Sequence, residues 1–272
     1  MKRESINFHQ TFYPNFDYIG KILDISNGES KRTINEISYI TGIPTGESSG
    51  KVQPHIKYCE YMNLIYAKII DGTYILERTE LGELIYQEDS YFSEKLSRLI
   101  CHFFLTSEHY GSELWYFAYR CLQEKYGNRI TKQVIEHDIF NNFGKSTKMT
   151  AYNSCYSSMQ SLGVLELIDF QNDVLIFKEF IYKDEYFYGI LYTIFKELKA
   201  YDNKRSEFTV DELFTKLKWN YAMNWSQDRT MKLLEKAFDD GWIDLNRQLV
   251  PTTIMLKRNI NDVIGLIYSE LI

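Results

Sequence analysis

The sequence contains few of the residues that build disulfide frameworks or flexible linkers. Only 4 of its 272 residues are cysteines, and no two of them form a C-x-x-C pair. Three of the four fall on the apolar faces of predicted helices, so we expect buried free thiols of the kind found in a reducing compartment. Only 4 prolines and 14 glycines are present, which predicts regular structure without long flexible linkers.

Long apolar runs are missing too. No uninterrupted apolar run of about 18 residues occurs, and residues 1–5 are not followed by the apolar core of a signal peptide, so we expect a cytoplasmic protein. Hydrophobic residues make up 44% of the chain, which is enough for a buried core, and the net charge is -6. With this acidic balance, any contact with nucleic acid requires a local basic surface.

One pattern occurs three times along the chain. In each copy a helical stretch ends at Asn or Gly and is followed by a short apolar strand, a turn and a second strand. The copies cover residues 55–65, 155–165 and 233–243, and their stops are Asn63, Gly163 and Gly241. Asn and Gly are the residues that end helices in a left-handed conformation, so the three stops are predicted to be equivalent.

Apolar residues precede each stop at helical spacing. They lie seven and four positions before it: Ile56 and Cys59, Tyr156 and Met159, Leu234 and Ala237. This spacing predicts one apolar stripe on each helix. A helix, a left-handed stop and a hairpin make up the second half of a winged helix, which usually binds nucleic acid or other proteins.

We therefore predict a mainly α fold with small β-hairpins, of the α+β class, in which multiple winged-helix units are joined by helical inserts. The predicted divisions are an N-terminal winged-helix unit at 1–90, a helical connector at 91–129, a second winged-helix unit at 130–182, and a helix plus a third winged-helix unit at 183–272. Asp71-Gly72, between two apolar stretches, is a strong hairpin signal.

The second unit contains the best candidate for a nucleic-acid contact. From Ile139 to Leu165 there is no Asp or Glu, although the chain has 37 acidic residues. Lysines, hydroxyls and amides near a helix N-terminus can contact phosphates, and Asn can read a base edge. The candidate DNA-binding residues are Lys145, Ser146, Thr147, Lys148, Tyr152 and Asn153. A protein interface and a plain solvated surface are the alternatives for this segment.

The first unit has a weaker form of the same signal. No acidic residue lies from Ser48 to Cys59, and the candidate DNA-binding residues there are Lys51, Gln53, His55 and Lys57. The helix predicted at 226–240 in the third unit instead mixes four acidic with three basic residues. Mixed charge predicts a structural or protein-binding role for that helix.

No motif that we identify predicts catalysis, a cofactor or a metal site. Gly144-Lys145-Ser146 lacks the first glycine of a phosphate loop, because position 139 is Ile. The histidines and cysteines have no zinc-binding spacing. We therefore expect a protein that is not an enzyme and that has no cofactor, no metal and no catalytic residue.

The first 130 residues resemble a bacterial family known as domain of unknown function 4007. The segments that carry the resemblance are 8–12, 49–51 and 79–89, with Leu99, His102 and Leu105 beyond them. Where the family has a Gly-Lys-Asn-Met-like run, this chain has Gly50-Lys51-Val52-Gln53. Relatives are often encoded beside genes of DNA phosphorothioation and phage defence. The resemblance implies a DNA-associated accessory protein, with no catalytic residue to carry over.

Three functions agree with these patterns. The first is a non-enzymatic accessory protein that binds double-stranded DNA in a bacterial phage-defence or DNA-modification system, with other proteins of the complex as further partners and no membrane contact. The second is a protein scaffold of a defence complex, which the acidic net charge and the 16% aromatic content favour. The third is a plasmid-type replication initiator or transcriptional regulator, which would prefer one DNA sequence.

Overall fold

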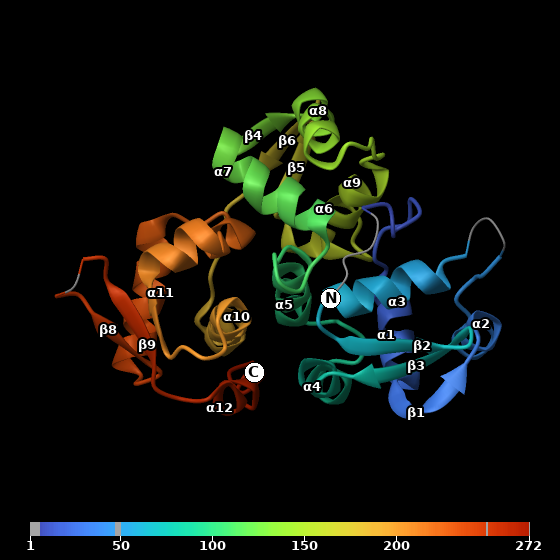
Figure 1. Cartoon of the computed structure of the whole chain (residues 1–272), viewed down its shortest axis with the longest axis horizontal. Helices are drawn as coiled ribbons and strands as arrows, with labels where there is room; N and C mark the ends of the chain where they lie inside the picture. Colours follow the sequence, from blue (N-terminus) through green and yellow to red (C-terminus); the bar gives the residue numbers. More distant parts are fainter. Residues whose placement is uncertain (1–5, 47–49, 249, 272) are drawn as a thin grey trace.

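The computed structural model describes residues 6–46, 50–248 and 250–271. Within these ranges the chain forms helices and three antiparallel sheets of three strands each. Figure 1 shows the sheets well separated from one another, at the right, the top and the left of the molecule, with helices between them. The structure confirms the predicted α+β class with small hairpins.

The first sheet belongs to the N-terminal unit. This unit consists of α1 (Phe16–Ile25), β1 (Asn27–Arg32), α2 (Ile34–Thr41), α3 (Val52–Tyr61), β2 (Ile65–Ile70) and β3 (Thr73–Arg78). Five helical segments lead from it to the second sheet: α4 (Glu80–Glu88), α5 (Lys95–Leu105), α6 (Glu113–Tyr116), the π-helix η1 (Phe117–Cys121) and α7 (Leu122–Tyr126).

The second and third sheets belong to the middle and C-terminal units. The middle unit consists of β4 (Arg129–Thr131), α8 (Lys132–Phe143), α9 (Thr150–Ser157), the 3-10 helix η2 (Leu162–Leu165), β5 (Ile168–Gln171) and β6 (Val174–Phe177). The C-terminal unit consists of η3 (Asp184–Tyr186), α10 (Phe187–Tyr201), β7 (Glu207–Thr209), η4 (Glu212–Lys216), η5 (Trp219–Met223), α11 (Gln227–Asp239), β8 (Ile243–Asn246), β9 (Thr253–Leu256) and α12 (Ile260–Ile264).

All three units share one order of elements. A strand is followed by helical segments and a hairpin, and the last strand of the hairpin pairs with both others, in the orders β1-β3-β2, β4-β6-β5 and β7-β9-β8. The shared order is compatible with the predicted winged-helix units, and that assignment stays a prediction. The sequence did not predict the first strand of any sheet, because β1, β4 and β7 are short or polar and show little apolar alternation.

The predicted left-handed stops are found in two units and misplaced in the third. Asn63 and Gly241 have φ angles of 57° and 72°, and each lies two residues before a strand. The prediction for Gly163 was wrong, because α9 already ends at Ser157 and Gly163 lies inside η2. The residue equivalent to the other two stops is Glu166, with a φ of 55°, two residues before β5.

Gly163 is required for close packing instead of for a left-handed turn. A Cβ atom at this position would lie 2.6 Å from the carbonyl oxygen of Ser158, and the amide of Gly163 donates a hydrogen bond of 3.0 Å to that same oxygen. A glycine at this place in the pattern can therefore serve either a left-handed turn or close packing, and only the conformation of the backbone distinguishes the two.

The hairpin signal was correct. Asp71 and Gly72 have φ angles of 49° and 75° and join β2 to β3, as expected for a two-residue turn with two left-handed positions. Asn172 and Asp173, with φ of 46° and 63°, form the same kind of turn between β5 and β6.

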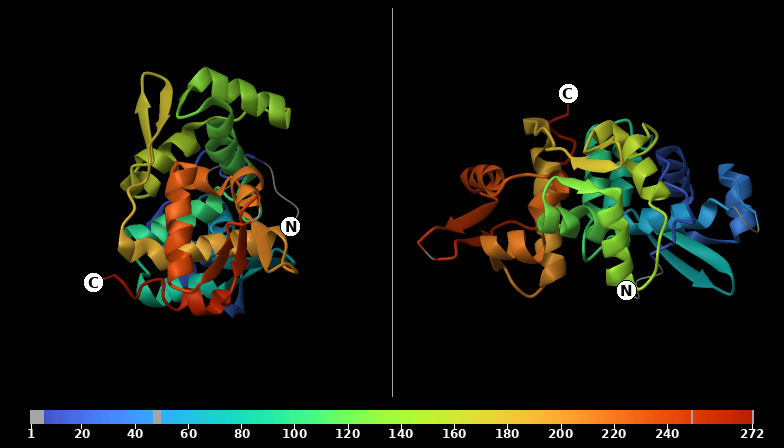
Figure 2. Two further views of the ribbon diagram at one scale, coloured as in Figure 1. Left: turned by 90° about the vertical axis from the view of Figure 1, so that its left-hand side faces the viewer. Right: turned by 90° about the horizontal axis from the view of Figure 1, so that it is seen from above.

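The buried hydrophobic side chains of all three units form one continuous core. Figure 2 shows from two further sides how the connecting helices lie between the units. The core continues across the predicted limits at residues 90, 129 and 182. Those limits stay predictions.

Candidate nucleic-acid interface

The helix that should dock DNA in the N-terminal unit is largely buried. Seven of the ten residues of α3 are inaccessible, and His55 is 1% exposed. One ring nitrogen of His55, Nδ1, lies 2.7 Å from the carbonyl oxygen of Lys51, and the other accepts a hydrogen bond from the amide of Asn15. Burial lowers the pKa of His55 to about 4, so the ring is neutral. The prediction that His55 contacts DNA was therefore wrong.

The other candidates of this unit are engaged within it. The ammonium group of Lys51 lies 5.5 Å from the ring centre of Phe12, and that of Lys57 forms an ion pair of 2.7 Å with Glu60. Gln53 is exposed and donates a hydrogen bond to the hydroxyl of Tyr74. Glu60 thus neutralises the charge of Lys57 and weakens the basic surface that the acid-free stretch predicted.

The middle unit also turns part of its predicted surface inward. Tyr152 is 1% exposed, with its ring 5.8 Å from Trp115 and 5.0 Å from Tyr156, measured between ring centres. The prediction that Tyr152 contacts DNA was therefore wrong. Asn153 is half-buried on the same helix, α9.

Aromatic packing explains why α3 and α9 are inaccessible. The indole of Trp115 contacts Tyr58 of α3 on one side, at 5.6 Å between ring centres, and Tyr152 of α9 on another. Phe8, from the N-terminal segment, packs on Tyr58 and Tyr61 as well as on Trp115. The two helices thus use their aromatic faces to join the units to each other.

The loop between α8 and α9 remains accessible. Lys145, Ser146 and Lys148 are exposed, while Thr147 is half-buried and donates a hydrogen bond to the side chain of Asn7. Neither lysine forms an ion pair with any residue in the described ranges. Ser146, Thr147 and Lys148 border a cavity of about 520 Å³, whose other wall includes His9 and Glu136. This loop is the part of the predicted DNA surface that the fold exposes.

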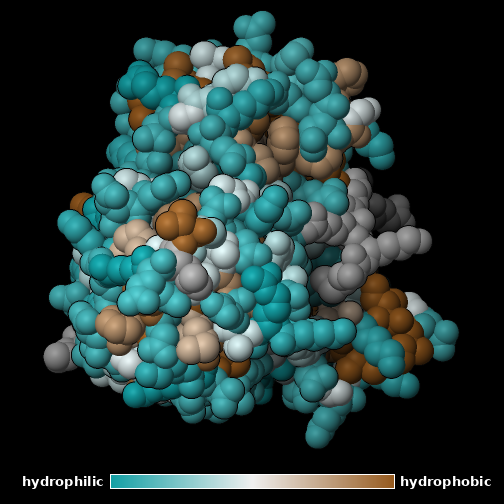
Figure 3. All heavy atoms as spheres, turned by 60° about the vertical axis from the view of Figure 1, so that its left-hand side comes forward, coloured by the Kyte–Doolittle hydropathy of each residue, from teal (hydrophilic) through white to brown (hydrophobic). Residues whose placement is uncertain are grey.

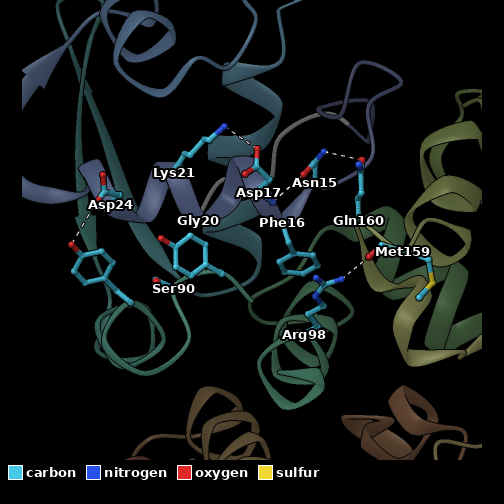
Figure 4. Close-up of a pocket in the computed structure, with 12 residues that line it drawn as sticks. Asn15, Phe16, Asp17, Gly20, Lys21, Asp24, Ser90, Arg98, Met159 and Gln160 are labelled. Carbon is cyan, nitrogen blue, oxygen red and sulfur yellow. Dashed lines mark hydrogen bonds and ion pairs between the residues drawn. The ribbon is translucent and has the colours of Figure 1, made fainter. Parts of the chain in front are cut away.

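A larger cavity, of about 760 Å³, lies where α1, the turn after α4, and the segment after α9 meet (Figure 4). Its polar side chains mostly bind one another. Lys21 forms an ion pair of 2.9 Å with Asp17, and the hydroxyl of Tyr86 donates a hydrogen bond to the carboxylate of Asp24. The side-chain amide of Asn15 donates a hydrogen bond to the side-chain oxygen of Gln160.

Arg98 lies at one side of the same cavity and is similarly occupied. Its guanidinium donates to the carbonyl oxygens of Phe92, Met159 and Ser161, and it lies 5.0 Å from the ring centre of Phe16. The charged side chains of this cavity already have ion-pair or hydrogen-bond partners within the protein. The cavity is therefore better explained as a gap at the contact between two units than as a binding site for a charged ligand.

The described residues bring together no candidate metal centre. Among them, no three His, Cys, Asp or Glu side chains lie close enough to hold a metal ion. Residues 46–50 match the G-x-S-x-G pattern of a nucleophile elbow. A nucleophile elbow follows a strand, whereas this segment follows α2. Residues 47–49, including Ser49 of the family resemblance, lie outside the described ranges. No helix in the described parts is long and apolar enough to cross a membrane.

The whole chain is similar in structure to two solved proteins. No protein-family model matches it, and no curated protein does. The structures titled "Magnesium ion-bound SspB crystal structure" and "SspB crystal structure" match with TM-scores of 0.74 and 0.75 and sequence identities of 16% and 15%. Each match covers 98% of this chain and 89% of the other. At this identity the likeness shows that the three chains share one fold.

Proposed function

We propose that this chain is a non-enzymatic accessory protein that binds double-stranded DNA in a bacterial phage-defence or DNA-modification system. The observation that most directly supports DNA binding is the exposure of Lys145 and Lys148 on the acid-free loop between α8 and α9. The resemblance of the N-terminal half to the phosphorothioation-associated family supports the biological setting, and the fold shared with SspB is compatible with it.

The proposed contact is made to phosphates. Two unpaired lysines and the hydroxyl of Ser146 supply charge and donors to a DNA backbone, which positions a protein without reading sequence. Asn153, the candidate residue that could read a base edge, is half-buried on α9, so its side chain is partly withdrawn. This withdrawal favours an accessory role over a replication initiator or transcriptional regulator, either of which must prefer one sequence.

Charge reversal at the loop tests the proposal. In a double variant Lys145→Glu with Lys148→Glu, we expect the affinity for a duplex of about 25 base pairs to fall by about 10- to 100-fold, because two phosphate contacts become repulsive. The slope of log affinity against log salt should decrease in magnitude by about 2 between roughly 50 and 200 mM salt. Fluorescence anisotropy with labelled duplex measures both quantities.

The matched control is Lys204→Glu with Lys216→Glu, which makes the same charge change at two exposed lysines of the C-terminal unit. If both variants weaken binding equally, net charge is responsible and the loop is not the site. A wild-type protein with no salt-sensitive affinity for duplex would overturn DNA binding itself. Conversion of supercoiled plasmid to nicked or linear forms in the presence of magnesium would contradict the non-enzymatic part of the proposal.

A further inference from the structure

The helix that precedes the hairpin of the C-terminal unit, α11, is exposed, but the charges beside it balance. Only four of its thirteen residues are buried: Thr230, Leu233, Leu234 and Ala237. Figure 3 shows that the side of the molecule carrying this unit is largely hydrophilic, with hydrophobic residues in small groups. In the groove beside α11, Arg229 pairs with Glu179, and Lys236 lies 3.7 Å from a carboxylate oxygen of Asp240. The positive and negative side chains around this groove therefore offset one another.

The cavity beside the α8–α9 loop, of about 520 Å³, differs in charge. Ser146, Thr147 and Lys148 form one wall, and the turn at residues 7–11 contributes another. The hydroxyl of Thr147 donates a hydrogen bond to the side chain of Asn7, and this bond joins the two walls. Lys148 is exposed and forms no ion pair with any residue in the described ranges.

One acidic side chain, Glu136 of α8, also belongs to the described lining of this cavity. Its carboxylate is 47% exposed and lies 4.0 Å from the ammonium group of Lys132, one turn earlier on the helix. Two lysines, Lys132 and Lys148, are thus matched by one glutamate, so one positive charge is uncompensated. The charge of the cavity therefore favours an anion.

His9 adds a buried donor to the same cavity. The residue lines the cavity although only 2% of its surface is exposed. Its Nδ1 accepts a hydrogen bond of 3.0 Å from the amide of Thr11, which places the ring proton on Nε2. Burial lowers the pKa of His9 to about 4, so the ring is neutral at pH 7.

Nε2 of His9 is buried and has no hydrogen-bond partner among the described residues. A buried donor without an acceptor destabilises a folded protein, and such donors are rare in native structures. Beside a cavity, an unpaired donor points to an acceptor that enters the cavity from outside.

We propose that this cavity binds a phosphate group that is free on three sides, as at the end of a DNA strand or in inorganic phosphate. The ammonium group of Lys148 supplies the charge, and the hydroxyl of Ser146 and Nε2 of His9 supply further donors. Such a phosphate has three acceptor oxygens, which match these three donors. A phosphate within a strand carries a sugar on both sides, which hinders its approach to a ring as buried as that of His9. Binding of a strand end in this way rests on the proposed function, whereas binding of inorganic phosphate does not.

Titration with inorganic phosphate tests the cavity without DNA. We expect phosphate to shift the resonance of His9 Nε2 in nitrogen NMR spectra, and sodium chloride at the same ionic strength to leave it unchanged. In calorimetry, His9→Phe should bind phosphate about tenfold more weakly than wild-type protein, because the new side chain keeps a ring beside Phe8 and Trp115 but has no donor. Lys148→Gln should lose at least as much affinity, because the charge is removed.

Glu136→Gln and Lys204→Gln complete the set of variants. Removing the carboxylate of Glu136 should strengthen phosphate binding by about 2- to 5-fold, a gain that a misfolded variant could not show. Lys204 is exposed in the C-terminal unit, and its replacement should leave phosphate binding unchanged. A His9 resonance that does not respond to phosphate would overturn the proposal, and so would equal phosphate affinity in His9→Phe and wild-type protein.

Duplexes with and without terminal phosphates distinguish the two sources of the ligand. If a strand end enters the cavity, wild-type protein should bind the phosphorylated duplex more tightly, and His9→Phe should abolish that difference without weakening binding of the unphosphorylated duplex. Equal affinity for the two duplexes would refute the strand end and leave inorganic phosphate as the ligand. A wild-type protein that binds phosphate but neither duplex would overturn the proposed function and leave the cavity site intact.

Discussion

Two buried histidines show how the surroundings of a side chain decide its role. His55 was a candidate for DNA contact, whereas His102 entered only through a family resemblance. In the fold, Nε2 of His102 lies 2.7 Å from the carbonyl oxygen of Ala222, so it donates, and Nδ1 then accepts from the hydroxyl of Tyr156. Burial lowers the pKa of His102 to about 3 and that of His55 to about 4, so both rings are neutral and structural.

These pKa values predict an acid-sensitive fold. Between the folded pKa values and the usual value of 6.5, the unfolded chain binds more protons than the folded one, so the free energy of unfolding falls as pH falls. From pH 7 to about 5.5, each histidine should cost about 1 kcal/mol of stability. Urea unfolding at the two pH values measures the loss.

The variant His55→Gln tests how much of this pH dependence of stability comes from His55. The control variant is His137→Gln, because His137 is exposed. Over the same pH range, His55→Gln should lose about 1 kcal/mol less than wild-type protein, because its site no longer takes up a proton on unfolding. The His137→Gln variant should follow wild-type protein. An identical pH dependence in all three proteins would contradict the assignment of His55 as a neutral buried ring.

At the scale of elements, apolar spacing and the Asp71-Gly72 turn signal identified helices and a hairpin, but not what those helices face. The positions before Asn63 are buried, as the stripe on α3 predicts. The opposite face of α3 is also largely covered, because Phe8 and Trp115 pack on Tyr58. Those contacts join segments far apart in sequence, so no local pattern could reveal them.

Gly163 supports a prediction at this scale. Gly163→Ala should lower the free energy of unfolding by about 1–3 kcal/mol, because the added Cβ would meet the carbonyl oxygen of Ser158 at 2.6 Å and η2 would have to move. Chemical denaturation measures the change.

The matched substitution is Gly265→Ala. Gly265 has a φ of -63°, and a Cβ there would meet nothing within 4 Å, so this variant should be neutral or slightly stabilising. If Gly163→Ala were as well tolerated as Gly265→Ala, close packing would not be the reason for the glycine.

At the scale of the whole molecule, a buried ion pair joins the connector to the C-terminal unit. Arg120 of η1 and Glu197 of α10 lie 3.0 Å apart between Nη2 and Oε1, and both are inaccessible. The same guanidinium donates to the carbonyl oxygens of Phe103 and Leu217. One side chain thus holds three segments distant in sequence.

Removing one partner of this pair should be more damaging than removing both charges. Arg120→Met leaves the carboxylate of Glu197 buried without a counter-charge, and should cost about 3–5 kcal/mol of stability. Adding Glu197→Leu should recover part of that loss, because the unpaired charge is removed. A double-mutant cycle by urea unfolding measures the coupling, and strictly additive losses would show that the pair is not coupled.

The sequence by itself determined the α+β class, the two-residue turn at Asp71-Gly72 and the acid-free stretch that carries the exposed lysines of the α8–α9 loop, because periodicity, turn chemistry and an absence of acidic residues are local properties. Only the tertiary structure decided that α3 and α9 turn inward and α11 outward. That choice depends on which aromatic side chains of distant segments meet at Trp115. The free energy gained by burying those aromatic side chains is larger than the cost of covering a few polar groups on the same helices.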